Sequence, residues 1–560
     1  MKKNLFRLGL GAVLVTMLAS CAKLGDMQPE YFAVNPNPLE VKAGKVEGTI
    51  TATFPEKYFV KKAVIDVTPV LRYEGGEAVG ETVTYQGEKV KGNDETIQYK
   101  AGGTASMNFS YNYVPAMANS VLTLRFKAIV GSKEVEIPDV DIAVGCLATS
   151  TLANATTVKP AFAKDNFVRD TKEVTEANIM FAIQRADVKT NDEFKALAKA
   201  EKDAAADSLR VIDGITLVSS ASPDGGVELN EKLAAQRQKN TADFLKKQKS
   251  QAALDAQYIA QDWDGFQKLV QASSVKDKDL ILRVLGSHAD PETREKEIKN
   301  LSAAYTELAS DILPALRRSH MELNVTLKGK TDEQILALAE SKPDSLTVEE
   351  LMFAAKLACQ AGNKEASAKY TEQNALQNPN DWRTQNNLAA VNIAKGDVTA
   401  SKNALNNSVN KGGSNAAETN FNLALVSLAE NDTEAAKGYF GKAAGVENLA
   451  EGQALLYLEE GDYAKAVSSF GNTTSNNAAL AQLLTNNNDK AASILNNVEK
   501  KDATTYYLLA ICASRASDDA NVIANLKEAV ALDNAYGQRM ATDLEFAKYW
   551  ANDDFKAIAK

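Results

Sequence analysis

The sequence has few of the residues that carry most enzyme chemistry. Its 560 residues include two histidines, His288 and His320, and four cysteines. Histidine is the usual general acid or base at neutral pH and a common metal ligand, and Cys146, Cys359 and Cys512 are too widely spaced for a zinc-binding motif. No phosphate-binding glycine loop, zinc-protease motif or nucleophile elbow occurs. We therefore predict no enzymatic activity, no catalytic residue, no metal site and no cofactor.

The sequence also lacks an excess of basic residues. Lys and Arg total 63 against 73 Asp and Glu, and the net charge of −10 disfavours nucleic acid, whose phosphates require a positive surface. Hydrophobic residues at 45% and charged residues at 24% are ordinary for a globular protein, and they exclude a disordered chain or a polytopic membrane protein. At roughly 150 residues per domain, this length predicts three or four domains.

The N-terminus has the layout of a secretory signal. Three basic residues in positions 2–7 precede an apolar run over residues 8–18, which is too short to span a bilayer. This layout predicts a signal peptide over residues 1–20. Its end, Leu-Ala-Ser before Cys21, resembles the lipobox of bacterial lipoproteins. The resemblance implies an acyl chain such as palmitate on Cys21, a lipidated tether over residues 21–27, and anchoring in the lipid of the outer membrane on the periplasmic side, with the leaflet left open.

The sequence pattern of the region after the tether predicts β-structure. Seven of the thirteen prolines fall between residues 28 and 145, and apolar and polar residues alternate over 65–72 and 122–130. Alternation with period two is typical of strands that have one buried face. We predict a β-sandwich over residues 28–148, acting as a spacer or binding module, followed by a connector over residues 149–176.

Strands alternate with helices in the next region. The pattern predicts strands at 179–183, 211–218 and 321–327 and helices near 192–202 and 229–245. On the second helix Arg237 shares the stripe of the apolar residues, where a half-buried guanidinium requires an acceptor. From spacing alone we favour an internal partner, Asp213 or Asp224, over a bound carboxylate ligand.

A family resemblance bears on the same helix. Residues 221–225, followed by Asn230, Leu233 and Arg237, resemble the peptidoglycan-binding core of the OmpA-like family, T-D-x-x-G and then N-x-x-L-S-x-x-R-A. Arg317-Arg318 resemble the end of that domain, which would span residues 177–328. The resemblance implies that diaminopimelate of peptidoglycan contacts Asp224, Gly225, Asn230, Arg237, Arg317 and Arg318. Ser222 stands where the family has its Asp, fifteen residues before the arginine.

The last part of the chain has an internal period. Turn signals recur at intervals of 34, 35, 30, 27 and 29 residues, at Gly362, Gly396, Asn431, Gly461, Asn488 and Ser517. No proline follows Pro379, so the helices between the turns are unbroken. The period predicts stacked helix-turn-helix units over residues 347–560, opened by a capping box at Thr347–Glu350 after a linker at 329–346. The array resembles degenerate tetratricopeptide repeats, with five or six units.

Stacked helical repeats form a concave groove that commonly binds peptides. We therefore predict a protein partner at the repeat groove. Four asparagines fall near first-helix positions that would face this groove: Asn386, Asn387, Asn420 and Asn422. We interpret their amides as solvent-facing polar groups, and the alternative is that they hold a peptide backbone.

These patterns predict a multidomain fold with an N-terminal all-β sandwich, a central α+β OmpA-like domain and a C-terminal all-α tetratricopeptide-like solenoid. The first functional hypothesis is a non-enzymatic envelope lipoprotein that is anchored in the outer membrane, contacts peptidoglycan and scaffolds a protein partner. The alternative is a surface or periplasmic binding lipoprotein whose OmpA-like domain no longer binds peptidoglycan and whose repeats capture a glycan, peptide or assembly partner. Ser222 favours the alternative.

Overall fold

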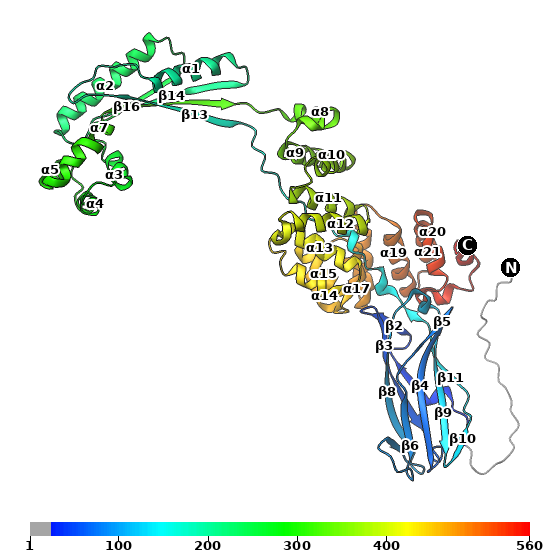
Figure 1. The fold of residues 1–560 in the computed structure, drawn as a ribbon. Coiled ribbons are helices and arrows are strands. Elements are labelled where there is room, and N and C mark those ends of the chain that lie inside the picture. The colour runs from blue at the N-terminus through cyan, green and yellow to red at the C-terminus, as the bar shows by residue number, and fades with distance from the viewer. Residues whose placement is uncertain (1–23, 560) are drawn as a thin grey trace. The chain divides into compact units, whose positions relative to one another are not determined.

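The computed structural model describes residues 24–559 and divides the chain into two units (Figure 1). Unit 1 comprises Met1–Lys164 and Thr371–Lys560, and unit 2 comprises Asp165–Tyr370. Unit 2 is therefore inserted into unit 1 in the sequence. The predicted signal peptide and Cys21 lie outside the described residues. None of the described helices combines the length and the apolar character needed to cross a membrane.

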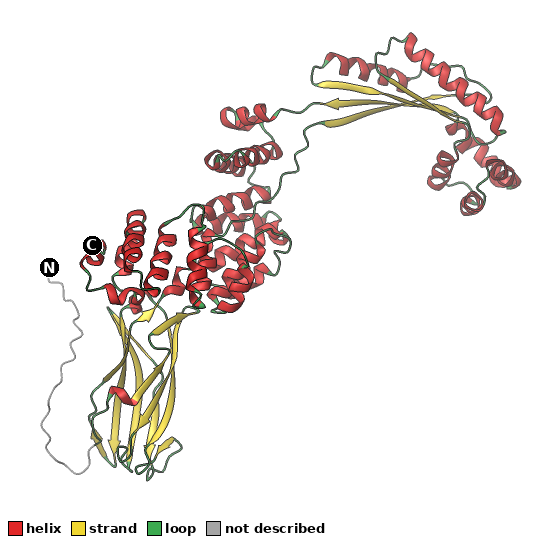
Figure 2. Ribbon diagram, turned by 180° about the vertical axis from the view of Figure 1, so that it is seen from behind, coloured by secondary structure: helices red, strands yellow, loops and turns green. Residues whose placement is uncertain are grey.

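Two β-sheets form the N-terminal part of unit 1 (Figure 2). The first sheet contains, in pairing order, β1 (Phe32–Asn35), β3 (Lys45–Phe54), β2 (Leu39–Lys42) and β12 (Cys146–Leu147), with β8 (Gly103–Asn112) beside β3. The second contains β10 (Lys133–Val135), β9 (Ser120–Val130), β4 (Ala63–Tyr73), β6 (Val83–Gly87) and β7 (Glu95–Ile97), with β11 (Val140–Val144) beside β9 and β5 (Gly76–Val79) beside β4. The strands predicted from alternation are confirmed, because β4 and β9 pair antiparallel along their whole lengths.

The inward-facing residues of the two sheets form one hydrophobic core. Leu24 and Met27 belong to this core and are buried, and the Tyr58 hydroxyl donates a hydrogen bond of 2.6 Å to the Gly25 carbonyl. Residues 24–27 were predicted to be part of a lipidated tether. That prediction is wrong for this segment, because the buried side chains of Leu24 and Met27 complete the sandwich core.

A helical repeat array forms the rest of unit 1, as predicted. Its described residues contain five consecutive helix pairs: α11 (Trp382–Ala394) with α12 (Val398–Asn410), α13 (Ala417–Ala429) with α14 (Thr433–Phe440), α15 (Leu449–Glu459) with α16 (Tyr463–Phe470), α17 (Asn476–Leu484) with α18 (Asn488–Asn496), and α19 (Ala503–Arg515) with α20 (Asp519–Leu532). The array ends with α21 (Ala535–Met540), the 3-10 helix η8 (Leu544–Tyr549) and α22 (Asp553–Ile558). First helices contact one another, as α11 contacts α13 and α13 contacts α15.

The turns inside these helix pairs share one backbone feature. Each contains a residue with positive φ, and these residues are Gly396, Asn431, Gly461, Asn486 and Ser517. Glycine and asparagine adopt this conformation at the lowest cost, which ends a helix and reverses the chain. The turn predicted at Asn488 lies at Asn486, because Asn488 is already the first residue of α18.

Unit 2 contains a four-stranded sheet with the order β13 (Thr171–Met180), β16 (Arg318–Leu327), β14 (Arg210–Ser220) and β15 (Leu254–Ile259). The helices α1 (Asp192–Ala206) and α2 (Val227–Lys247) cover one face, where Ala177, Leu217 and Met321 are buried. Strand β13 pairs with β16 over its full length and therefore begins at Thr171, inside the predicted connector.

Two helical segments complete unit 2. The first lies between β15 and β16 and has its own hydrophobic core; it contains α3 (Trp263–Ala272), α4 (Lys278–Ser287), α5 (Pro291–Asn300), α6 (Ser302–Glu307), a π-helical turn (Leu308–Ile312) and α7 (Leu313–Leu316). The second contains α8 (Asp332–Ser341), α9 (Val348–Gln360) and the first half of α10 (Lys364–Gln377), a helix that continues into unit 1 at Thr371. The predicted linker is thus mostly the helix α8, which packs on α9. The capping box predicted at Thr347 is confirmed.

Candidate functional site

Five of the six residues that the resemblance to OmpA-like domains singles out lie together around the start of α2. This cluster comprises Asp224, Gly225, Asn230, Arg237 and Arg317. The sixth, Arg318, is the first residue of β16, and its guanidinium lies 3.4 Å from the Asn178 side-chain oxygen. Arg318 therefore makes a contact outside the cluster.

Arg237 is fully buried, and its hydrogen bonds go to backbone groups. Its guanidinium donates to the carbonyl of Arg185 at 2.9 Å, to that of Ser220 at 2.8 Å and to that of Ala182 at 3.3 Å. The guanidinium also lies 4.9 Å from the centre of the Phe181 ring. These contacts fix α2 against the ends of β13 and β14, and they use three of the five N–H donors of the guanidinium.

Neither of the two residues predicted as the partner of Arg237, Asp213 and Asp224, is hydrogen-bonded to it. Asp213 forms an ion pair of 2.8 Å with Lys172, and Asp224 forms one of 3.2 Å with Arg317. Burial, and after it the nearby Arg317 cation, lower the pKa of Arg237 to about 10, while the Asp224 carboxylate opposes the shift. Arg237 thus has the acceptor that sequence reasoning required, but backbone carbonyls supply it.

Ser222 joins the cluster where the family motif has its Asp. Its hydroxyl donates to the Asp224 carboxylate and accepts a hydrogen bond of 3.0 Å from Arg317. The Asn230 amide donates to the carbonyls of Ser222 at 2.9 Å and of Gly225 at 2.8 Å, which holds the turn against the helix start. The polar groups of the motif are therefore bonded to one another.

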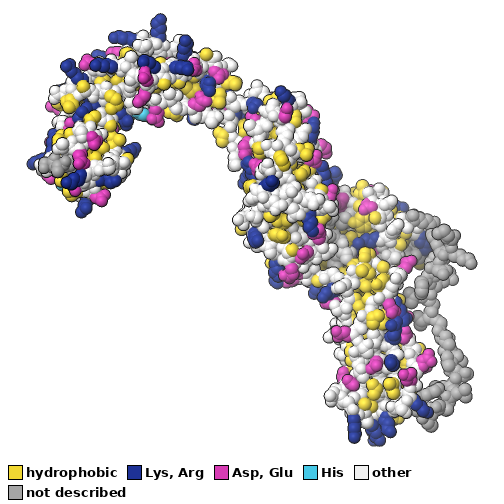
Figure 3. All heavy atoms as spheres, viewed as in Figure 1, with side chains coloured by type: hydrophobic (Ala, Val, Ile, Leu, Met, Phe, Trp, Pro, Cys, Tyr) yellow, Lys and Arg dark blue, Asp and Glu magenta, His cyan; other side chains and the backbone are white. Residues whose placement is uncertain are grey.

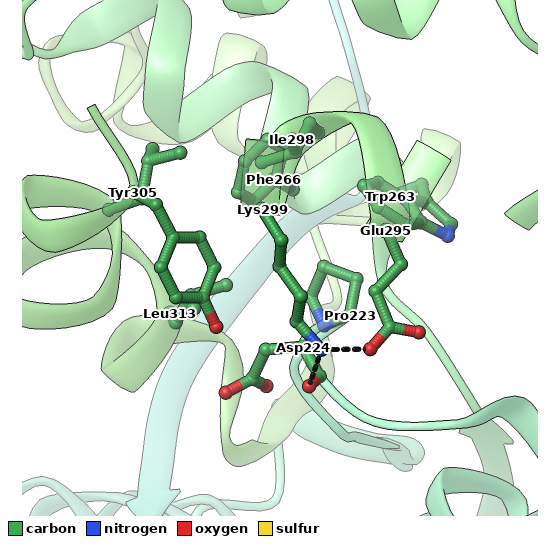
Figure 4. A pocket seen from close by; sticks show the side chains of 10 residues that line it. Pro223, Asp224, Trp263, Phe266, Glu295, Ile298, Lys299, Tyr305 and Leu313 are labelled. Atoms are coloured by element: carbon green, nitrogen blue, oxygen red, sulfur yellow. Dashed lines mark hydrogen bonds and ion pairs between the residues drawn. The ribbon is translucent and has the colours of Figure 1, made fainter. Parts of the chain in front are cut away.

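The helical segment between β15 and β16 packs over this turn (Figure 4). Lys299 of α5 donates a hydrogen bond of 3.0 Å to the Asp224 carbonyl and also contacts the Glu295 carboxylate. The space between these residues, Trp263 and Phe266 has a cavity volume of about 10 Å³. A volume of this size holds about one water molecule, whereas ligand pockets are typically about 300–1,000 Å³.

A second candidate site lies on the first helices of the repeat array. Residues 152–164, which we call the strap, run across α17, α13 and α11 and are drawn in cyan in Figure 1. Three asparagines, which we call the clamps, each bind both backbone groups of one strap residue. Asn477 binds Asn154 at 3.0 and 2.9 Å, Asn422 binds Ala161 at 2.8 and 2.7 Å, and Asn387 binds Ala163 at 2.7 and 3.1 Å.

The clamps occupy one repeated position. Each lies nine residues before the positive-φ residue of its own turn, so all three project from the same place on the first helices α11, α13 and α17. In α15 this position is Gly452, where an added Cβ would lie 2.7 Å from the Phe440 ring. Close packing of Phe440 therefore leaves no room for a clamp in that repeat.

The buried clamps correct the interpretation of the groove asparagines as solvent-facing. Asn386, Asn387 and Asn422 are buried and contact the strap backbone, so the alternative interpretation is confirmed for these three. Asn420 is also buried, but its amide donates to carbonyls of its own repeat. Asn477 was not predicted from the sequence, because the nine-residue spacing counted from the turn predicted at Asn488 leads to Ala479.

The residues just before the strap are hydrogen-bonded both to the sandwich and to the end of the repeat array. Ser150 donates a hydrogen bond of 2.6 Å to the Val41 carbonyl of β2, and Thr149 donates one of 2.6 Å to Glu545 of η8. Within the strap, Leu152 and Val158 are buried in the hydrophobic core of the repeats. The strap and the residues just before it therefore pack against both the sandwich and the repeats and hold the two together. The sequence pattern predicted only a connector there.

The clamps bind mainly backbone groups of the strap, because an asparagine amide offers one acceptor and two donors that match a peptide unit. Asn477 in addition donates a hydrogen bond of 3.2 Å to the Thr157 hydroxyl of the strap. The backbone contacts accept any side chain that fits. A short covalent link keeps the strap at an effective concentration of about millimolar or above, so a free peptide with equal contacts competes poorly. The surface predicted to bind a protein partner is occupied by the chain itself.

No protein-family model and no curated protein matches the chain. Among solved structures, a tetratricopeptide repeat protein from Parabacteroides merdae is 13% identical, with 44% of this chain and 98% of that chain covered and a TM-score of 0.29. The Pseudomonas aeruginosa pilF protein is 13% identical, covering 38% and 96% with a TM-score of 0.25, and the APC/C hetero-tetramer Cut9-Hcn1 is 12% identical, covering 63% and 69% with a TM-score of 0.31. These similarities are low, and the repeat architecture rests on the helix pairs themselves.

Proposed function

We propose that the protein is a non-enzymatic scaffold lipoprotein of the bacterial envelope, anchored in the outer membrane on the periplasmic side by lipid on Cys21. The observation that carries this proposal is the clamped strap. It fixes the repeats to the sandwich, as a scaffold requires, and it fills the first-helix face through backbone contacts. A protein partner of the repeats then contacts their other surfaces.

The central OmpA-like domain, in this proposal, does not hold peptidoglycan through the family's arginine. Three observations support this choice of the alternative hypothesis. Arg237 is fully buried with three carbonyl acceptors, Ser222 replaces the family's Asp, and the space next to Asp224 accommodates about one water molecule.

Co-sedimentation of the full-length protein with purified sacculi tests the proposal. We expect the wild type to stay in the supernatant under conditions in which an OmpA-like protein with the motif's Asp pellets. Ser222→Asp should also stay soluble, because the helical segment over the turn still covers the site. Pelleting of the wild type that is lost in Asp224→Asn but kept in Arg318→Ala would instead support peptidoglycan binding, the first hypothesis.

The anchor is tested separately by membrane fractionation and metabolic palmitate labelling. We expect the wild type to be labelled and to fractionate with the outer membrane, and Cys21→Ser to be unlabelled and released from that fraction. An unlabelled wild type would contradict the lipid anchor without affecting the sacculus result.

A further inference from the structure

Four side chains with metal-ligand chemistry meet on the sheet face of unit 2 opposite α1 and α2. In the β13–β16 register Glu176 lies directly opposite Glu322, and Asn178 lies opposite His320. Residues between them, such as Met321, point to the helix-covered face and are buried. Two carboxylates directly opposite each other on neighbouring strands repel and destabilise the pair. A positive charge between them would relieve this repulsion.

Lysine and arginine do not supply that charge. In the part of the chain that the structure describes, neither Glu176 nor Glu322 forms an ion pair with either residue type, and the nearby Arg318 contacts the Asn178 amide instead. Figure 3 shows a histidine side chain (cyan) at the surface of unit 2 with acidic side chains (magenta) beside it. The remaining candidates are a proton on His320 or a bound cation.

The orientation of the His320 ring is set by a chain of hydrogen bonds. The Asn178 amide nitrogen donates to Glu193 at 3.1 Å, so the amide oxygen faces the ring, 3.0 Å from Nδ1. This oxygen is an acceptor, so a neutral ring that donates to it from Nδ1 carries its lone pair on Nε2. Nε2 lies 3.1 Å from a Glu322 carboxylate oxygen, which is also an acceptor. The ring therefore directs a free ligand atom at the carboxylates.

We infer that Glu176, His320 and Glu322 bind one divalent transition-metal ion, and that Zn²⁺ is the ion that fits. One ligand atom from each residue lies within 4.8 Å of the other two. Zinc takes imidazole nitrogen and carboxylate oxygen at about 2.0–2.2 Å in a tetrahedron, and three protein ligands leave the fourth position to water. The ion neutralises both carboxylates, whereas a single proton on His320 neutralises one charge.

Asn178 and Glu193 act as positioning residues in this site. A metal-binding histidine typically donates its other ring N–H to an oxygen acceptor, which fixes its tautomer and orientation. Here the Asn178 oxygen is that acceptor and Glu193 holds the amide. The site differs from the sequence-based prediction of no metal centre, because its ligands come from strands about 140 residues apart in the chain.

Zinc titration of the untagged full-length protein tests the inference. The chain has two histidines, so imidazole ¹H–¹⁵N spectra report on His320 while His288, at the end of α4, serves as the internal reference. After chelation and desalting, we expect one Zn²⁺ per chain by calorimetry and a shift of the His320 Nε2 signal alone. His320→Gln and Glu176→Gln should each weaken Zn²⁺ binding at least tenfold, and Asn178→Leu roughly tenfold.

His288→Gln is the matched control and should keep the wild-type affinity. The ligands lie on an exposed face, and melting curves without metal verify that each variant folds; if His320→Gln fails to fold, Glu176→Gln decides alone. The inference is overturned if Zn²⁺ leaves the His320 signals unchanged, including the case in which both ring nitrogens stay protonated. It is also overturned if the ligand variants bind Zn²⁺ as tightly as the wild type.

Discussion

Substitution of the clamp Asn422 allows the free energy with which the repeats bind the strap to be measured. Asn422 is fully buried, accepts the Ala161 N–H at 2.8 Å and donates to the Ala161 carbonyl at 2.7 Å. Asn422→Ala removes both bonds and also the hydrogen bond of 3.0 Å that the Asn422 amide donates to the Asn386 side-chain oxygen, while Asn386 still donates to the same carbonyl at 3.1 Å. The change thus leaves one buried N–H without an acceptor and removes one of two donors from the carbonyl.

The expected free-energy cost for the strap follows from the unpaired Ala161 N–H and from the donor lost at the Ala161 carbonyl. A buried N–H without a partner costs about 1–3 kcal/mol and a lost hydrogen bond about 1 kcal/mol. Opening of the strap therefore becomes easier by about 2–4 kcal/mol. Since about 1.4 kcal/mol corresponds to a tenfold change in an equilibrium constant, we expect the strap amides to exchange with deuterium roughly 30- to 1,000-fold faster than in the wild type.

Hydrogen exchange with mass spectrometry on peptides covering the strap measures this change. Asn420→Ala is the matched control, because Asn420 is equally buried on α13 but donates to the carbonyls of Ser414 and Ala416. We expect this control to destabilise its repeat without a selective effect on the strap. Unchanged strap exchange in Asn422→Ala, or equal acceleration in both variants, would refute the clamp assignment.

Three further predictions concern buried ionisable groups. Burial raises the pKa of Glu459 to about 8 from 4.5, so between these pH values the folded state keeps a proton that the unfolded state releases, and stability falls as pH rises. The thermal stability of Glu459→Gln, measured by calorimetry, should therefore rise relative to that of the wild type as the pH rises from about 5 to about 8. A stability difference that stays constant over this pH range would contradict this. Burial raises the pKa of Cys146 to about 11 and of Cys512 to about 12, so we expect Ellman's reagent at neutral pH to modify the exposed Cys359 and to spare both others until unfolding. Arg237→Ala removes the hydrogen bonds of the guanidinium to three carbonyls, of which the Ala182 carbonyl keeps the bond from the Arg185 N–H. We expect it to destabilise unit 2 by about 3 kcal/mol or more in urea unfolding, whereas a change below about 1 kcal/mol would refute its structural role.

Local patterns were sufficient for the helices and most turns of the repeats. Gly396, Asn431 and Gly461 were found from sequence because few other residues adopt positive φ at low cost. The turn at Asn486 was placed two residues late, since the run Asn486-Asn487-Asn488 offers three equivalent turn residues. In the same way, alternation located β4 and β9 but did not reveal that Leu24 and Met27 extend the core.

The residues around Arg237 that resemble the OmpA-like motif show what a local sequence pattern can predict and what it cannot. The helical stripe placed Arg237 on the buried side and required an acceptor for its guanidinium. The acceptors are backbone carbonyls of Ala182, Arg185 and Ser220, and any residue has a carbonyl. Side-chain identity therefore favoured Asp213 or Asp224, and neither is the hydrogen-bonding partner of Arg237.

The sequence by itself determined the order of β-rich and helical regions and the repeat period, because these follow from interactions between residues near each other in the chain. Only the tertiary structure decided what the clamps bind. The strap lies 224 to 323 residues from the asparagines that hold it. The clamps' contacts to backbone atoms impose no side-chain pattern at Asn154, Ala161 and Ala163, so these positions cannot be recognised from the sequence until the fold brings the strap onto the repeats.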